Sequence, residues 1–201
     1  MDPITSLDAL HAHYGTPAEA ALRKVVPYLI PSYRAVLERS RFCILTTVGP
    51  EGTDGSPRGD DGPVVTVLDD RTLALPDWKG NERIDSLRNI VRDGRISLCF
   101  LIPGWKNLLR VNGTAILTAD PDLRARFDRG GVQPRTVIVI TIAEVYSQCA
   151  RAVVRAGLWT AGDQSLGLPS IGRMMDEASQ GQIDGTTYDA ARANRAMTDI
   201  W

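Results

Sequence analysis

Residues 56–90 decide the fold of this chain, and they read SPRGDDGPVVTVLDDRTLALPDWKGNERIDSLRNI. Two short apolar runs lie within them, at 64–68 and 72–75, and their composition is typical of β-strands. The two runs flank the dipeptide Asp70-Arg71. This spacing predicts an antiparallel hairpin that closes through a tight turn.

A polar loop and a helix follow the hairpin. Gly80 allows a tight turn and Asn81 is a good N-cap, so we expect a helix over 82–92. Its first N–H groups lack partners and its dipole favours an anion. Arg83 and Ser86 are three residues apart and therefore project from one side of the helix. Together with Lys79 they could hold a phosphate group, although the acids in this segment equally suit a helix start without a ligand.

The rest of the chain supplies further strands and few helices between them. Residues 51–62 are rich in Gly, Asp, Ser and Pro and are expected to form a loop. Gly113 lies inside a long strand, where it suggests a β-bulge or a close approach by another group. The spacing favours a mainly β fold, a six-stranded antiparallel barrel. The six expected strands are Phe42–Val48, Val64–Leu68, Thr72–Leu75, Arg95–Leu101, Leu108–Thr118 and Thr136–Ile142.

Helical patterns gather at both ends of the chain. We interpret the sequence as one domain of residues 1–201, with a helical arm over 1–41, a barrel over 42–148 and a helical tail over 149–201. The expected helices are 5–41 with breaks at its prolines, a short one over 120–127, one over 144–159, and two near 170–179 and 185–198.

Composition and charge exclude several classes of function. The chain is 43% apolar, which suffices for a folded core, and its net charge is −1. No overall basicity draws it to nucleic acid or anionic lipid. No apolar run is long enough to span a membrane, and the start of the chain does not resemble a signal peptide. We therefore expect a cytoplasmic protein that acts on a small molecule.

Few residues suit direct catalysis or metal binding. The cysteines, Cys43, Cys99 and Cys149, are far apart and are expected to be small buried hydrophobic residues. The two histidines, His11 and His13, have no cluster of further ligands, so no metal site is expected. No nucleophile elbow, P-loop or dinucleotide fingerprint is present. An enzyme with this sequence would need a cofactor to supply the chemistry.

Arginine is the prominent cation, since 20 of the 23 basic residues are Arg and three are Lys. Arg58 lies in a glycine-containing loop, where it could clamp a phosphate or simply be solvated. Arg110 lies in a strand, where it either faces solvent or requires an anionic partner. The abundance of arginine could equally reflect the nucleotide composition of the source genome.

Several of these segments together resemble the pyridoxamine 5′-phosphate oxidase-like family of FMN-binding split barrels, in particular a bacterial subgroup without a settled substrate. The likeness rests on SPRGD, VVTVLDDRTLALPDWKGNERIDSLRNI, SLCFLIPG and LLRVNG, and it covers about residues 40–160. The resemblance implies a split β-barrel that forms a homodimer with FMN at the subunit interface.

The resemblance also implies which residues bind the cofactor. Arg58 and the segment from 79 to 86 would hold the phosphate. The strand from 64 to 67 would lie along the flavin ring, and the partner subunit would add the helix from 151 to 159. The expected cofactor-binding residues are Arg58, Val64, Val65, Thr66, Val67, Pro76, Asp77, Lys79, Asn81, Arg83, Ser86, Arg110, Arg155 and Trp159.

The sequence departs from authentic pyridoxamine 5′-phosphate oxidases in its substrate motif. Those enzymes pair arginine with histidine near the C-terminus, whereas no histidine follows His13 here. We therefore expect an FMN-dependent oxidoreductase with a different small-molecule substrate. The alternatives are a flavin-binding or redox-sensing module without turnover, a deazaflavin protein, and a haem-binding split barrel.

Overall fold

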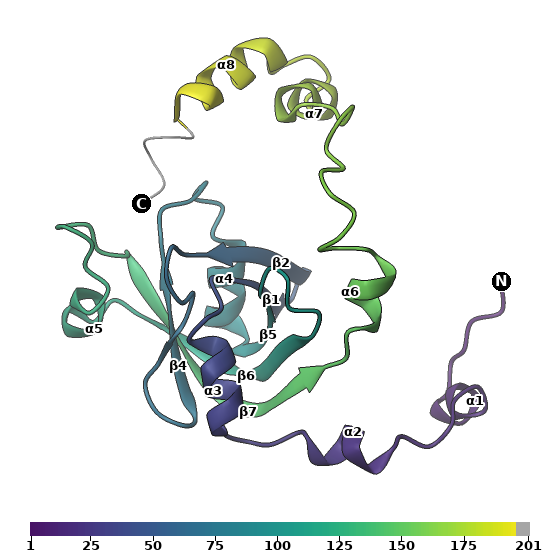
Figure 1. The fold of residues 1–201 in the computed structure, drawn as a ribbon. Helices are drawn as coiled ribbons and strands as arrows, with labels where there is room; N and C mark the ends of the chain where they lie inside the picture. Colours follow the sequence, from purple (N-terminus) through teal and green to yellow (C-terminus); the bar gives the residue numbers. More distant parts are fainter. Residues whose placement is uncertain (196–201) are drawn as a thin grey trace.

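A seven-stranded antiparallel sheet forms the body of the molecule, and helices flank it at both ends of the chain (Figure 1). The structure is a computed structural model that describes residues 1–195. The sheet curls into a split barrel with the strand order β2-β1-β5-β6-β7-β4-β3. The mainly β fold class is thus confirmed, but the expected number of six strands is wrong.

The bounds of the elements are as follows. The strands are β1 (Phe42–Gly49), β2 (Gly52–Gly59), β3 (Thr66–Val67), β4 (Thr72–Asp77), β5 (Arg95–Leu101), β6 (Leu108–Thr118) and β7 (Thr136–Gln148). The helices are α1 (Leu7–His11), α2 (Glu19–Arg23), α3 (Pro31–Leu37), α4 (Asp85–Arg92), α5 (Pro121–Ala125), α6 (Arg151–Arg155), α7 (Ile171–Ala178) and α8 (Gly185–Arg195). The last three residues of the helix expected at 185–198 lie outside the described residues.

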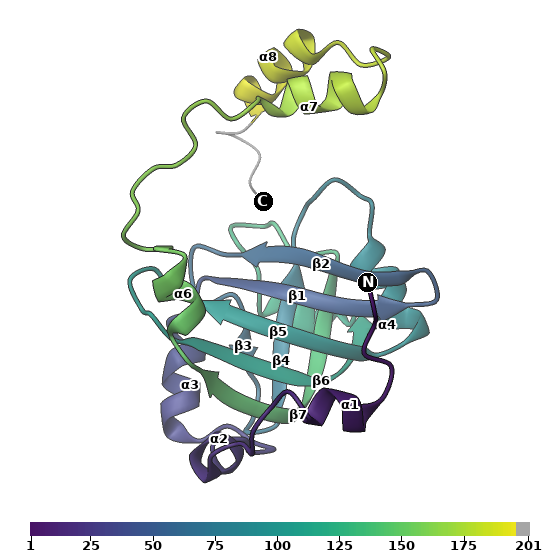
Figure 2. The same ribbon diagram turned by 90° about the vertical axis from the view of Figure 1, so that its right-hand side faces the viewer.

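The core lies inside the curled sheet. Strand β5 alternates between buried and partly exposed positions, so Ile96, Leu98 and Phe100 all point inward. Strand β7 has consecutive buried residues such as Val137 and Ile138, because both of its faces are covered there. Helices α3 and α4 pack their apolar faces against this core. Figure 2 shows β2, β1, β5, β6 and β7 side by side in the sheet.

Most of the segment expected to be a loop at 51–62 is instead an edge strand, β2, which covers Gly52–Gly59. Strand β2 pairs with β1 along its whole length, from Phe42 opposite Gly59 to Gly49 opposite Gly52. An edge strand tolerates glycine, proline and polar residues because one of its sides makes no ladder. Its composition therefore resembled a loop although its backbone completes the sheet.

Two other boundaries also differ from the expectations. The run at 64–68 forms just the two-residue strand β3, which pairs with β4 across the predicted turn. Strand β7 continues to Gln148, where a helix over 144–159 was expected, and α6 begins later, at Arg151. Glu144 pairs with Asn112 and Val145 with Val111 in the β6–β7 ladder. This long-range pairing overrides the helical tendency of the local sequence.

Helices α7 and α8 form a hairpin that stands apart from the barrel (Figure 1). They cross closely at Gly172 and Gly185, where a Cβ on either glycine would overlap with the backbone of the other. Asp189 of α8 accepts a hydrogen bond of 2.8 Å from the backbone N–H of Gly172. No helix within residues 1–195 has the length and apolar character needed to cross a membrane.

Gly113 lies at a closely packed point of the barrel, where strands β6 and β7 meet. The predicted irregularity is confirmed, because the β6–β7 register shifts between Asn112 and Gly113. A Cβ at Gly113 would overlap with the carbonyl oxygen of Thr141. We expect Gly113→Ala to lower the free energy of unfolding by about 1–3 kcal/mol, measured by chemical denaturation.

Gly55 in β2 provides the matched control, because no heavy atom of the described residues other than Gly55 and its two chain neighbours lies within 4 Å of a Cβ placed there. Gly55→Ala should change the free energy of unfolding by about 0.5 kcal/mol or less. Equal losses for the two variants would contradict this account of Gly113.

Candidate functional site

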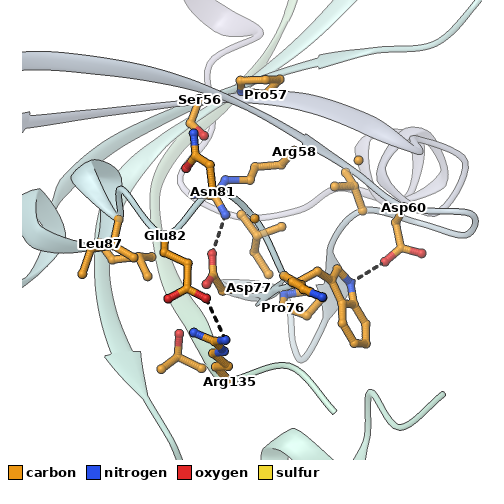
Figure 3. A pocket seen from close by; sticks show the side chains of 18 of the residues that line it. Ser56, Pro57, Arg58, Asp60, Pro76, Asp77, Asn81, Glu82, Leu87 and Arg135 are labelled. Atoms are coloured by element: carbon orange, nitrogen blue, oxygen red, sulfur yellow. Dashed lines mark hydrogen bonds and ion pairs between the residues drawn. The ribbon is translucent and has the colours of Figure 1, made fainter. Parts of the chain in front are cut away.

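A cavity of about 1050 Å³ lies where the barrel is split (Figure 3). Its walls come from the end of β2, the end of β4, the loop before α4 and the start of β7. Its lining residues are Ser56, Pro57, Arg58, Gly59, Asp60, Asp61, Val64, Leu75, Pro76, Asp77, Trp78, Lys79, Gly80, Asn81, Glu82, Ile84, Leu87, Arg135 and Thr136.

An ion pair joins two walls of this cavity. Arg58 on β2 donates from Nη1 to Oδ1 of Asp77 on β4 at 2.5 Å (Figure 3). These strands are far apart in the sheet order, so the pair spans the split in the barrel. The two side chains are only 18% and 15% exposed. Burial of this kind makes the loss of either partner costly, because the other charge would be left unpaired.

Two polar atoms, one within this ion pair and one on the residue opposite Asp77, have no hydrogen-bond partner among the described residues. They are Nε of Arg58 and the hydroxyl oxygen of Thr136, and both are buried. Thr136 lies opposite Asp77 in the β4–β7 ladder. Buried polar groups are usually satisfied, so this wall of the cavity is suited to a ligand that accepts hydrogen bonds.

The carboxylate of Asp60 organises the opposite wall. Its side chain is 4% exposed and accepts hydrogen bonds from the Trp78 indole at 3.0 Å and from the Gly62 backbone at 3.0 Å. Arg129 pairs with both Asp60 and Asp61 and lies over the Trp78 ring, 5.3 Å from its centroid. The hydrogen bond from Arg129 also lowers the pKa of the Asp61 carboxyl. These contacts fix an aromatic side chain in the cavity wall.

A further, exposed ion pair lies beside the cavity. Arg135 donates to Glu82 at 2.9 Å, and both side chains are more than 60% exposed. This hydrogen bond lowers the pKa of the Glu82 carboxyl. Because solvent screens an exposed pair, it contributes little stability and is free to exchange partners.

Residues 29–149 of this chain match the model of a protein family, and that family is described as pyridoxamine 5′-phosphate oxidase. The chain belongs to the pyridoxamine 5′-phosphate oxidase family. No curated protein matches the sequence. The match includes every strand and all the residues that line the cavity.

Solved structures of related fold include HupZ from Group A Streptococcus, which is 18% identical, with 59% of this chain and 93% of that one covered and a TM-score of 0.48. General Stress Protein 26 from Bacillus anthracis is 16% identical, with 57% and 89% covered and a TM-score of 0.44. An FMN-binding protein from Syntrophomonas wolfei is 12% identical, with 70% and 95% covered and a TM-score of 0.44.

Six of the residues expected at the cofactor site of this family member line the cavity together. They are Arg58, Val64, Pro76, Asp77, Lys79 and Asn81. Val65 is buried in the core, and Thr66 and Val67 form β3 outside the cavity lining. The structure thus brings Val64 together with the loop and strand-end residues, but the other three residues of the strand that was expected along the flavin ring do not line the cavity.

The loop before α4 differs from the expected helix start. Helix α4 begins at Asp85, because Glu82 and Ile84 have positive φ angles of 62° and 52°. Asn81 does not cap the helix; its side-chain oxygen accepts a hydrogen bond of 3.2 Å from the backbone N–H of Arg83. The cavity therefore faces an irregular turn. The expected helix start at Glu82 is wrong, whereas the binding of an anion at this helix N-terminus stays a prediction.

Arg83 and Ser86 do not lie in the cavity lining. The Arg83 side chain is 76% exposed and pairs with Asp85, with a shortest distance of 2.8 Å. Ser86 is buried and donates its hydroxyl to Asp54 on β2. The left-handed turn at Ile84 separates the two side chains, so the expectation that they share one side does not hold.

The remaining expected residues lie on other parts of the molecule. Arg110 is half-buried on the outer face of the sheet, 5.4 Å from the centroid of the Tyr146 ring. Arg155 is exposed on α6. Trp159 donates its indole N–H to the carbonyl oxygen of Trp105 at 2.9 Å. None of these three lines the described cavity.

Sequence reasoning missed Thr136, Arg135, Asp60 and Trp78. Thr136 begins a strongly apolar strand and Arg135 directly precedes it, and their place in the cavity depends on the register of β7 against β4. Asp60 lies two residues after the predicted site residue Arg58, and Trp78 directly follows the predicted site residue Asp77, so proximity in the sequence was the available signal.

The cysteines lie outside the cavity lining. Cys43 pairs with Arg58 in the β1–β2 ladder, and burial raises the pKa of its thiol to about 12. Cys99 is half-buried, but Cys149 is exposed, so the expectation of three buried thiols is wrong for Cys149. Within residues 1–195, no group of three or more His, Cys, Asp and Glu side chains is placed to hold a metal ion.

Asp60 and Asp61 provide a paired test of the cavity wall. Asp60→Ala should lower the free energy of unfolding by about 2 kcal/mol in chemical denaturation, because it leaves buried donors unsatisfied. Asp61 pairs with the same arginine, but its side chain is 66% exposed, so Asp61→Ala should leave the denaturation midpoint nearly unchanged. A larger effect at Asp61 than at Asp60 would contradict the structural role of Asp60.

Proposed function

We propose that this protein binds FMN in the cavity at the split of the barrel and is a flavin-dependent oxidoreductase acting on a small molecule. The observation that carries the proposal is the pair of unsatisfied buried groups among the described residues, Arg58 Nε and Thr136 Oγ1, in a cavity of about 1050 Å³. Membership of the pyridoxamine 5′-phosphate oxidase family supports the same cofactor.

The residues of the cavity fit both parts of FMN. Arg58, Lys79, Arg135 and the Thr136 hydroxyl offer donors to a phosphate. Val64, Leu75, Pro76 and the Trp78 ring offer apolar surface to a planar ring system. Bound FMN would supply the hydride or electron transfer, and the protein would anchor the cofactor and exclude water around it.

We also propose a homodimer in which a second copy completes the cofactor site. The outer face of β5, β6 and β7 carries Arg110 over Tyr146 and a hydrogen bond of 2.6 Å from Asn112 to Glu144. The side-chain oxygen of Asn112 is buried and has no partner within residues 1–195. Partly buried polar groups of this kind on an open sheet face suit a subunit interface. Arg110, Arg155 and Trp159 would then act at this interface.

Turnover separates an enzyme from a flavin-binding module. Reduction of the bound flavin by NADH or NADPH, followed by reoxidation by a small-molecule acceptor, would support an oxidoreductase. A flavin that resists both reductants would favour the module without turnover.

FMN affinity tests the proposed phosphate anchor. Arg58→Ala should weaken FMN binding by about 1.5–3 kcal/mol, or roughly 10- to 150-fold, because it removes a charged donor. The measurement is a titration that follows flavin fluorescence. Riboflavin, which lacks the phosphate, should bind the wild-type protein far more weakly than FMN.

Arg83→Ala is the matched control for Arg58→Ala. Arg83 was expected to hold the phosphate, but its exposed side chain lies outside the cavity lining. Its replacement should change the affinity by roughly twofold or less. A large loss at Arg83 with none at Arg58, or equal binding of FMN and riboflavin, would place the phosphate elsewhere.

A further inference from the structure

The hairpin of α7 and α8 has no apolar core of its own. The two helices are eight and 11 residues long, and helices of this length are marginal in water unless one face packs against another body. Within residues 171–192, the buried positions are Gly172 and Gly185, which lie where the two helices cross. No apolar side chain in this range is buried. The hairpin therefore requires a further surface to pack against.

The barrel of the same chain does not provide that surface. Two views show an extended segment that leads from α6 to α7 and keeps the hairpin away from the barrel (Figure 1 and Figure 2). Residues 161–170 of this segment are all exposed, and so are Met174, Met175 and Ile183 on the hairpin. Exposed apolar side chains that gather in one short stretch of chain indicate an interaction surface.

The hairpin is also acidic. Over residues 171–192, four acidic residues face two basic ones. Glu177 pairs with Arg173 at 2.9 Å within α7, whereas the exposed Asp176 forms no ion pair in the described part of the chain. A surface that is apolar and basic would therefore complement the hairpin.

One exposed surface of this chain has that character, and we call it the α6 patch. It consists of Lys106, Arg151, Val154, Arg155 and Leu158, which are all exposed. The segments 102–111 and 149–160 contain no acidic residue. The three basic side chains of the patch form no ion pair within residues 1–195.

The two segments of the α6 patch are neighbours in the fold. Leu108 at the start of β6 lies opposite Gln148 at the end of β7, so the loop before β6 and the helix after β7 leave the sheet at the same end. The indole N–H of Trp159 donates to the carbonyl oxygen of Trp105 at 2.9 Å and ties the two segments together. The patch therefore adjoins the outer face of β6 and β7.

Building on the proposed homodimer, we infer that the α7–α8 hairpin of each protomer docks on the α6 patch of its partner. Arg110 and Tyr146 of the proposed interface lie on the same two strands that lead into the patch. A two-fold dimer presents one hairpin and one patch from each protomer, so the exchange of hairpins covers both surfaces at once. The extended segment before α7 allows this exchange, because it holds the hairpin away from the patch of its own chain (Figure 1).

Cross-linking between two distinguishable full-length chains tests the exchange. Both chains carry Cys99→Ser and Cys149→Ser, while the third cysteine, Cys43, is buried. One chain also carries Met174→Cys and the other Val154→Cys, and the two are co-expressed with different tags and purified on both. A flexible bismaleimide should join them into a covalent heterodimer. Ile183→Cys in place of Met174→Cys provides a second hairpin position.

A matched cysteine and two charge reversals make the contact specific. Asp122→Cys, an exposed position on α5 at the opposite side of the barrel from α6, should give no covalent heterodimer when it replaces Val154→Cys (Figure 1). Arg151→Glu on the Val154→Cys chain should lower the yield roughly threefold or more, because it opposes the acidic hairpin. Arg126→Glu, at an exposed arginine on the far side, should leave the yield unchanged.

The outcomes separate this inference from the proposed dimer. Dimers in sedimentation without a covalent heterodimer from either hairpin position would overturn the exchange and leave the homodimer standing. A cross-link confined to one chain, when Met174→Cys and Val154→Cys are placed together, would show that the hairpin folds back on its own patch. Equal losses of yield for Arg151→Glu and Arg126→Glu would contradict the charge match. A monomer in sedimentation would refute the proposed homodimer and the exchange with it.

Discussion

The structure depends on the meeting of the two ends of one antiparallel sheet. Strand β2 lies at one end of the strand order and β4 next to the other, yet Arg58 and Asp77 are in direct contact. Because the ion pair is largely buried, each charge requires the other or a substitute. The barrel is therefore closed by side chains at the point where its backbone ladder is interrupted, and the cavity occupies that interruption.

This arrangement explains how a small barrel can present both a charged anchor and an apolar surface. The core behind the cavity is built from residues such as Leu75 and Leu98 and makes the strands rigid. Polar side chains at the strand ends then project into the split without disturbing that core. Asp60 fixes Trp78 on the facing wall through a buried hydrogen bond, so the shape of the cavity is set before any ligand arrives.

The amino-acid pattern predicted the strands whose side chains carry the core. The bounds of β5 and β6 agree with expectation, because alternating apolar residues report burial directly. Strand β2 was not predicted, because it pairs through its backbone and carries mainly polar side chains, whereas the prediction of strands relied on apolar side chains. The turn before α4 was not predicted either, since glutamate and isoleucine rarely adopt the positive φ angles that Glu82 and Ile84 have here. Thr136 lies at the cavity because of the register of β7 against β4, and the local sequence does not indicate that register.

The account's central claim is the position of the cofactor phosphate, and a crystal structure of the protein grown with FMN tests it most directly. The account predicts that the phosphorus lies in the split of the barrel, with phosphate oxygens within hydrogen-bond distance of the Arg58 guanidinium and the Thr136 hydroxyl. Electron density that places the phosphate elsewhere, with the Arg58–Asp77 contact intact and the cavity filled by solvent, would contradict it.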